Sequence, residues 1–396
     1  MKNITGVTCV LVAGAAFMAG QASADQEVTD PWSLSATVGS QYTDNRDGTK
    51  ANKESNVDVT AAPRLDLRIR GERSLLNLFI EPGVKWHSNP RTVQEGDPQN
   101  ETDLYGAGGV DLGYYFSPRT MIKLGDTLTY ADDPEITERG ASVRRSDNHW
   151  LNTVYGNLGV EVSEKTDLTI NGRDSIKRYT DNVVAQDQDE DVVDTDANLK
   201  YLTGMGVSVF GTVGYSDFSN RSTERDRGSQ VLTYGVGLEK MFNPDFVATV
   251  RGGYQTAKYD DRTLDDVDTG NARADVVLRG ASSTRFRAGA SYGFSSPNVR
   301  PYSLQTLSAV FGSVEHDVLA NLTVALRGQY ADGDYKRESA TLPGGHDKLT
   351  TVGVDGNYRF NRHLALRLGY TYENWDSDVR ESFDRNTVDV ALKADL

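Results

Sequence analysis

Cysteine is almost absent from this chain of 396 residues. The one cysteine, Cys9, lies in an apolar run, residues 4–18, that follows Lys2 and precedes small residues at 22–24. This order is typical of a secretory signal peptide, so we expect residues 1–24 to be removed and residues 25–396 to form one domain. An uncleaved membrane anchor is the weaker alternative, because the run is too short to span a bilayer. Without Cys9 the mature chain can form neither a disulfide nor a cysteine-ligated metal site.

Long apolar runs are missing beyond this N-terminal segment, and the mean hydropathy of the chain is −0.52. Membrane-spanning helices, which need about 20 apolar residues, are therefore not expected there. A transmembrane β-strand needs only about ten residues, of which every second one is apolar. The low mean hydropathy therefore does not exclude a membrane β-barrel.

Positive charge is scarce. The chain has 42 Lys and Arg against 57 Asp and Glu, a net charge of −15, which becomes −16 when Lys2 leaves with the signal peptide. This acidity argues against nucleic acid as a partner. Acids gather in the stretches 180–191 and 260–268, whereas the short turns 242–245 and 361–363 have few. Short turns on one side and long loops on the other are typical of an outer-membrane barrel.

Strict alternation of apolar and polar residues is the dominant pattern. From Leu364 to Glu373 the even positions are Leu or Tyr, and the odd positions include Arg367 and Thr371. Segments of this kind recur from residues 32–43 to residues 386–395 and predict an all-β, antiparallel, up-and-down transmembrane barrel of about eighteen strands, with sixteen as the alternative. An even number places both termini on the short-turn side. A soluble β-sandwich alternates in the same way, but its turns do not separate into short and long sets.

Two segments deviate from the pattern. Asp126 falls on the apolar face of its strand, and the segment 302–313 changes phase midway, for which we expect a β-bulge. Aromatic residues beside acids mark the strand ends at the long loops, as at Tyr42, Tyr130 and Trp375 and also at Tyr259 and Tyr335. We expect these rings to form an aromatic girdle at the membrane interface, and carbohydrate stacking is the alternative.

Projection of the polar face into the barrel collects a set of arginines. These candidate lumen-lining residues are Arg64, Arg68, Arg173, Arg251, Arg273, Arg279, Arg285, Arg287, Arg327, Arg359 and Arg367. The same face holds a similar number of acids, among them Asp275 and Asp355. Arginine pairs with carboxylates and phosphates, so the set can form a path for an anionic polymer. The alternative is that each arginine pairs with a neighbouring acid and stiffens the wall.

Pairs of glycine and tyrosine, such as Gly253-Tyr254 and Gly369-Tyr370, followed by Tyr-Asp or Trp-Asp at the loop, give the chain a family resemblance. It resembles the β-barrel porin type 2 group of bacterial outer-membrane proteins over nearly the whole mature chain. The resemblance implies a place in the outer membrane beside exopolysaccharide or capsule machinery. It also implies contact with outer-membrane lipid, lipopolysaccharide and the barrel assembly machinery. The chain departs from the usual pattern by ending on Leu396 instead of an aromatic residue.

The sequence contains little that supports a catalytic function. The chain has five histidines, and none has the spacing of a nucleophilic, metal or acid-base motif; they are His87, His149, His316, His346 and His363. A catalytic group can be assembled from distant strands, so an enzyme is a third hypothesis. We nevertheless expect no enzyme and no cofactor.

A calcium site has weak candidates in Asp187, Asp189 and Asp191. The segment is not an EF-hand, because Val192 stands where the loop needs glycine and Asn198 where it needs a bidentate glutamate. We therefore assign no metal, although loop cation binding remains an alternative.

The leading hypothesis is an outer-membrane channel for exopolysaccharide or other polar solutes. The second is a non-conducting surface barrel whose acidic loops bind a partner or cations.

Overall fold

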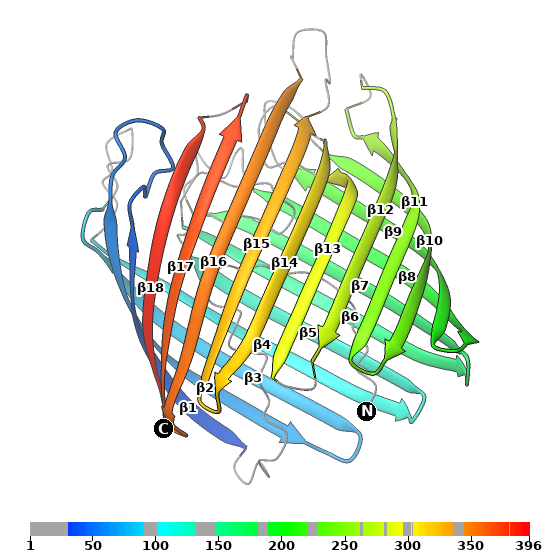
Figure 1. Ribbon diagram of the computed structural model, residues 1–396, viewed down its shortest axis with the longest axis horizontal. Helices are drawn as coiled ribbons and strands as arrows, with labels where there is room; N and C mark the ends of the chain where they lie inside the picture. The colour runs from blue at the N-terminus through cyan, green and yellow to red at the C-terminus, as the bar shows by residue number, and fades with distance from the viewer. Residues whose placement is uncertain are drawn as a thin grey trace.

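The computed structural model describes residues 31–90, 101–131, 148–180, 189–220, 228–261, 264–280, 283–295, 302, 304–335, 344–379 and 381–396. Within these residues no helix is both long and apolar enough to span a membrane. Regular structure in the described chain consists of eighteen strands (Figure 1). The predicted signal peptide, residues 1–24, lies outside the described residues.

The strands follow one another along the chain with similar lengths of 12–17 residues. They are β1 (Trp32–Thr43), β2 (Asn56–Arg70), β3 (Ser74–His87), β4 (Thr102–Ser117), β5 (Thr120–Ala131), β6 (His149–Ser163), β7 (Thr166–Tyr179), β8 (Glu190–Gly204), β9 (Val207–Asn220), β10 (Ser229–Asn243), β11 (Phe246–Tyr259), β12 (Val267–Arg279), β13 (Thr284–Ser295), β14 (Gln305–Leu319), β15 (Leu322–Tyr335), β16 (Gly345–Asn361), β17 (Leu364–Ser377) and β18 (Phe383–Asp395).

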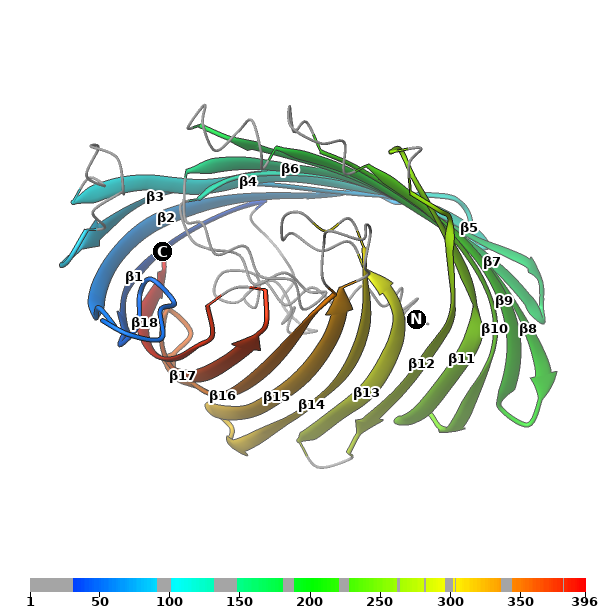
Figure 2. The same cartoon turned by 90° about the horizontal axis from the view of Figure 1, so that it is seen from above.

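Each strand pairs antiparallel with its neighbours in sequence, and β1 also pairs with β18 from Ser35↔Asp395 to Thr43↔Thr387. This last pairing closes the sheet into a ring, which Figure 2 shows from above. Closure satisfies the backbone groups that a free edge would expose to lipid. The prediction of an antiparallel barrel of about eighteen strands is confirmed, and the alternative of sixteen is wrong.

Turns on the two ends of the barrel differ in length. At the end that carries the C-terminus, tight turns join β4 to β5 and β16 to β17 (Figure 1). Six of these tight turns carry a register shift just before the turn, as between Arg359 and Asn361. Such bulged hairpins match the twist of the strands.

The phase change near residue 302 has a different cause from the expected bulge. β14 starts at Gln305 and pairs with β13 without a shift, from Ser295↔Gln305 to Thr284↔His316. Tyr302 and Leu304 precede the strand and are buried in two apolar clusters. The prediction of a bulge within 302–313 was wrong, because tertiary packing and not strand alternation holds these two side chains.

Apolar side chains of the strands point away from the barrel. Leu368 and Val236, for example, are 50% and 70% exposed, as expected for a surface that lipid covers. Asp126 lies on this face, in one register row with Val154 and a second acid, Asp174. Asn152 donates a hydrogen bond of 2.6 Å to Asp126. The lipid-facing wall over β5–β7 therefore carries two carboxylates, and nothing in the structure explains them.

Aromatic residues do not all join the expected girdle. Tyr42 is 44% exposed on the outer face, as predicted. Trp375, by contrast, is 1% exposed and packs inside the barrel with Leu349, Phe383 and Ala331. Tyr335 and Tyr259 also lie against inner apolar clusters, so the girdle prediction was wrong for these rings.

Glycines on the inner face make room for aromatic rings. In five cross-strand pairs a glycine lies directly opposite an aromatic residue, and a Cβ at the glycine would lie less than 3 Å from the ring. The pairs are Gly83 with Tyr105, Gly109 with Phe79, Gly125 with Tyr155, Gly237 with Phe210 and Gly289 with Phe311. Rings that cover glycine backbone in this way pin the register of a sheet.

Candidate functional site

The inner face of the barrel holds the polar half of every strand, and it is the candidate site. The register places all eleven arginines of the sequence analysis on the face opposite the exposed apolar residues. Arg68, Arg279, Arg285 and Arg359 are exposed near the short-turn end, and the other seven lie further along their strands. Their role in lining a conducting path stays a prediction.

Four residues on β11–β13 form what we call the Asp275 cluster: Arg251, Arg273, Asp275 and Arg287. Arg273 binds the Asp275 carboxylate through Nε at 2.6 Å and Nη2 at 3.1 Å. Arg287 approaches the same carboxylate at 3.8 Å. Arg251 lies directly opposite Arg273 in the register, so two like charges face each other. The cluster therefore sets three guanidinium groups against one carboxylate.

Arg251 differs from its neighbours in having no ion-pair partner among the described residues. Its Nε is enclosed and has no hydrogen-bond acceptor there. The Nδ2 of Asn271, two residues before Arg273, is also enclosed without an acceptor among the described residues. Two enclosed donors without acceptors are unusual, because each costs free energy unless something else supplies the acceptor.

A second group on β15–β18, which we call the Asp355 cluster, contains Arg327, Asp355, Arg367 and Asp389. Asp355 binds Arg327 at 2.5 Å and Arg367 at 3.3 Å. Asp389 lies in the same register row as Asp355, with Gly369 between them. Gln41 of β1 donates a hydrogen bond of 2.7 Å to Asp389. Here two guanidinium groups face two carboxylates.

Further arginines on the inner face are paired in the same way. Arg64 binds Asp66 at 2.9 Å and Glu81 at 3.0 Å, and its guanidinium lies 4.2 Å from the centre of the Phe79 ring. Arg285 binds Glu315 at 3.1 Å. For these arginines, the alternative interpretation of the sequence, pairing with acids across strands, describes what the structure contains.

Sequence reasoning missed some inward cations. Arg385 binds Glu373 at 2.5 Å, but it preceded the predicted start of the last strand. Lys177 is 2% exposed on the inner face of β7 and was not considered. The alternation that found the arginines could have found both residues, with an earlier start of the last strand and with lysines included.

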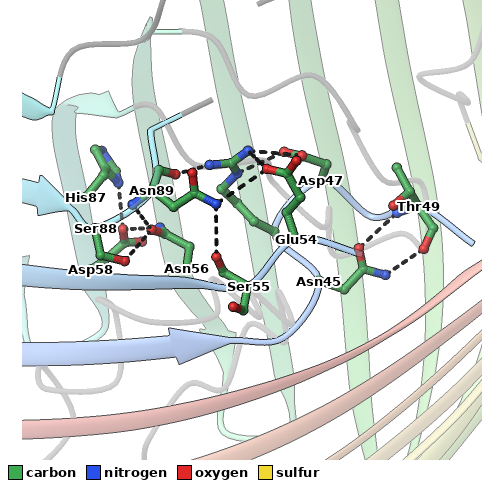
Figure 3. A network of polar contacts seen from close by, with 11 residues as sticks. Asn45, Asp47, Thr49, Glu54, Ser55, Asn56, Asp58, His87, Ser88 and Asn89 are labelled. Carbon is green, nitrogen blue, oxygen red and sulfur yellow. Dashed lines mark hydrogen bonds and ion pairs between the residues drawn. The ribbon is translucent and has the colours of Figure 1, made fainter. Parts of the chain in front are cut away.

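A polar network ties the β1–β2 loop to the end of β3 (Figure 3). Arg46 is buried and binds Asp47 at 3.0 Å, Glu54 at 3.1 Å and the backbone carbonyl of Asn89. Below it, Asn56 donates a hydrogen bond to Asp58. These contacts hold the loop against the wall and satisfy a buried guanidinium.

His87 belongs to the same region of the inner face. Its Nδ1 lies 2.6 Å from Asp58 and its Nε2 lies 3.2 Å from Asp103. Two carboxylates thus hold the imidazole ring between β2 and β4, which is an arrangement that fixes the orientation of the ring.

Metal ligands come together once within the described chain. Single ligand atoms of Asp332, Asp334 and His346 lie within 4.8 Å of one another at the loop end of β15 and β16. The imidazole of His346 contacts Asp334 at 2.7 Å and Asp332 at 3.3 Å, so the group is already joined as an ion pair.

Two of the weak calcium candidates also have cationic partners. Arg178 binds Asp191 at 2.5 Å and lies 3.9 Å from Asp189. Asp187 lies outside the described residues.

Comparisons with solved structures find the same fold in several bacterial proteins. OpdK of Pseudomonas aeruginosa has a TM-score of 0.53 at 9% identity, with 92% of this chain and 99% of that chain covered. OccK9 of the same organism has a TM-score of 0.52 at 13% identity, with coverage of 92% and 99%. OccAB4 of Acinetobacter baumannii has a TM-score of 0.50 at 15% identity, with coverage of 93% and 99%. At these identities the likeness shows the fold alone.

A search of curated proteins found no match. The model of one protein family, described as "Putative beta-barrel porin 2", matches residues 33–396, which is nearly the whole chain and includes all of the barrel except its first residue. This agrees with the resemblance expected from the Gly-Tyr and Tyr-Asp patterns. The chain therefore belongs to the beta-barrel porin 2 family, and its fold is that of a porin-like outer-membrane channel.

Proposed function

We propose that the barrel is a passive channel that carries polar solutes with anionic groups across the outer membrane, with an acidic exopolysaccharide on its way out as the first candidate. The observation that carries this proposal is the separation of the two faces: apolar side chains outside, and ionic clusters around the inner wall. Barrels of about 16–18 strands leave a water-filled interior, in which charged side chains stay hydrated.

The ionic pattern favours anionic over cationic solutes. Most inner carboxylates named above are bound to arginine, as Asp275, Asp355 and Glu315 are. An acid that is already paired attracts a passing cation weakly, whereas Arg251 of the Asp275 cluster has no ion-pair partner among the described residues and can attract an anion. The family resemblance supports export of a polysaccharide, and the inner wall supports its acidic character.

Planar-bilayer conductance tests this function. We expect the purified chain to form pores whose permeability ratio favours chloride over potassium, and the ratio to fall in the double variant Arg285→Ala, Arg287→Ala. Gly356→Ala, on the outer face where an added Cβ meets nothing within 4 Å, is the matched control. Pores that prefer cations, or that the arginine variants leave unaltered, would contradict the anionic part of the proposal.

Electrical silence of the folded protein would contradict the channel itself. It would favour the second hypothesis, a surface barrel whose acidic loops bind a partner or cations. Uptake of acidic and neutral oligosaccharides into liposomes that contain the protein would then separate the solute classes. A channel that passes neutral oligosaccharides faster than acidic ones of equal length would exclude the acidic polymer.

We also propose that residues 1–24 are removed during export and that the barrel assembly machinery inserts the mature chain beside lipopolysaccharide. The positive start, apolar run and small residues at 22–24 support the cleavage. The intact mass of the membrane-extracted protein tests it, because a mature chain begins at Asp25. A mass that includes residues 1–24 would favour the membrane anchor.

A further inference from the structure

Among the eleven inward arginines, Arg251 alone combines the absence of an ion pair with an enclosed Nε that has no acceptor among the described residues. Arg273, Arg287, Arg327 and Arg367 each lie within 4.0 Å of a carboxylate. Arg251 forms no ion pair within the described chain, and the acids whose charges act on it, Asp196 and Asp275, bind Asn171 and Arg273 instead. The Nε–H of a guanidinium group needs a hydrogen-bond acceptor where water is excluded from it, so Arg251 has an unsatisfied donor.

The Nδ2 of Asn271 is a second unsatisfied hydrogen-bond donor near Arg251. Arg251 and Asn271 lie diagonally across β11 and β12 on the same face, because Arg251 pairs with Arg273 and Gly253 pairs with Asn271. Gly253, opposite Asn271, lies against the backbone of β10, because a Cβ there would lie 1.9 Å from the Tyr234 backbone oxygen. The wall thus presents two neighbouring donors without acceptors among the described residues.

We propose that the Asp275 cluster, together with Asn271, binds the carboxylate group of a solute. The carboxylate would accept hydrogen bonds from Arg251 and Asn271, and it would balance the charge of Arg251. A planar group with two acceptor oxygens matches a guanidinium fork and an amide. The proposal rests on the proposed channel function and names the chemical group that the channel recognises.

The Asp355 cluster is the internal comparison. Its arginines have two carboxylates between them, and an incoming anion would have to displace Asp355 or approach Asp389. Desolvating an anion without gaining a free cation is unfavourable. The same face of the same barrel therefore contains one position that accepts a carboxylate and one that does not.

Galacturonate, a sugar with one carboxylate, is the probe, and galactose is the neutral control. In bilayers we expect the current of sodium galacturonate to saturate with concentration. Arg251→Gln should raise the half-saturating concentration about tenfold, as the loss of a charge-assisted hydrogen bond does. Arg251→Lys, which keeps the charge but loses the fork, should raise it by a smaller factor, and Asn271→Ala by about threefold. Arg327→Gln should change it by about twofold at most.

Saturation-transfer NMR of galacturonate with the detergent-solubilised full chain is a second measurement that does not need conduction. Binding that Arg251→Gln abolishes, with no binding of galactose, would support the site even if the bilayer recordings were silent and the channel function failed. Equal losses in the Arg251→Gln and Arg327→Gln variants would overturn the proposal in a conducting channel. Displacement of galacturonate by phosphate at lower concentration than by acetate would overturn the assignment to a carboxylate.

Discussion

The Asp275 cluster and the Asp355 cluster share the start of one register row and differ in the residue that ends it and in the number of arginines. In each, an acid pairs in the register with a glycine, and the glycine pairs with a third residue on the next strand. The rows are Asp275–Gly289–Phe311 and Asp355–Gly369–Asp389. Where the Asp355 cluster has a second carboxylate, the Asp275 cluster has an aromatic ring. The ring contributes no charge, and Arg251 of the Asp275 cluster has no ion-pair partner among the described residues.

This difference shows how one region of a barrel wall can be stiffened by ion pairs while another region binds a solute. Arginines that share enough carboxylates within the wall join neighbouring strands and offer little to a solute. Arg251 lies opposite Arg273 and has no such partner among the described residues, and like charges in this position destabilise the pair of strands. Retaining Arg251 opposite Arg273 has a cost in stability that solute binding can offset.

Asp355→Asn should have the largest effect, because it removes the carboxylate that Arg327 and Arg367 share. We expect a loss of about 2 kcal/mol in the free energy of unfolding, since hydrogen bonds to charged groups are broken and the groups are partly buried. The two released guanidinium groups should also raise the chloride preference. Urea unfolding in lipid vesicles and bilayer reversal potentials measure the two effects. An unchanged reversal potential would mean that the Asp355 cluster does not face the conducting path.

Gly289→Ala should have the second-largest effect, because the Phe311 ring of the Asp275–Gly289–Phe311 row covers this glycine. An added Cβ would lie 2.5 Å from Phe311 and 2.9 Å from the Ala274 backbone oxygen, and Arg287 lies 5.4 Å from the centre of that ring. Overpacking of this kind costs about 1–3 kcal/mol. Gly369→Ala in the other row is the control, because its nearest contact is Asp355 Oδ1 at 3.3 Å. Equal losses of unfolding free energy in the two variants would contradict the difference between the rows.

Asp389→Asn should make the Asp355 cluster resemble the Asp275 cluster, with two guanidinium groups against one carboxylate. Asparagine keeps an acceptor for Gln41, which now bonds Asp389 at 2.7 Å. We expect less than about 1 kcal/mol of destabilisation and a measurable rise in chloride preference. Reversal potentials in a salt gradient provide the test. A shift toward cations would show that Asp389 does not balance these arginines.

The exposed pair Lys53–Asp384, at 2.7 Å on the loop side, should have the smallest effect. The hydrogen bond to Asp384 raises the pKa of Lys53 above its ordinary value of 10.5. Because the raised pKa belongs to the folded state, the contribution is present below pH 10.5 and is lost as the pH rises through the raised value. Solvent screens the pair, so Lys53→Ala should leave the urea midpoint at pH 8 unchanged. A clear fall of that midpoint would show that surface pairs matter as much as the inner clusters.

Much of the fold was predictable because alternation is a local property. The segment from Leu364 shows both faces in ten residues, and β17 begins at that residue. The same reasoning placed Asp126 on the outer face, where the register puts it. The girdle prediction failed at Trp375, where alternation alone points inward: the residue has an odd number, and its ring packs against Leu349 and Phe383 inside the barrel.

The candidate site was predictable as a set but not as an arrangement. All eleven arginines could be assigned to one face from their position in each strand. Which of them has an acid partner depends on cross-strand register, and Asp355 shows this because its partners come from strands on either side. Arg251 lies opposite Arg273, and Asp275 binds Arg273 instead of Arg251, which no local pattern reveals.

The sequence by itself determined the barrel architecture: strands with alternating apolar and polar residues, turns that are short on one side, and an apolar face for lipid. The physical reason is that side chains of a strand alternate between its two faces, so the order of residues is enough. Only the tertiary structure decided that the ring closes at eighteen strands and that Arg251 lacks an acid where Arg327 and Arg367 share one. These properties depend on hydrogen-bond register between strands, and a one-residue shift would pair every side chain with a different partner.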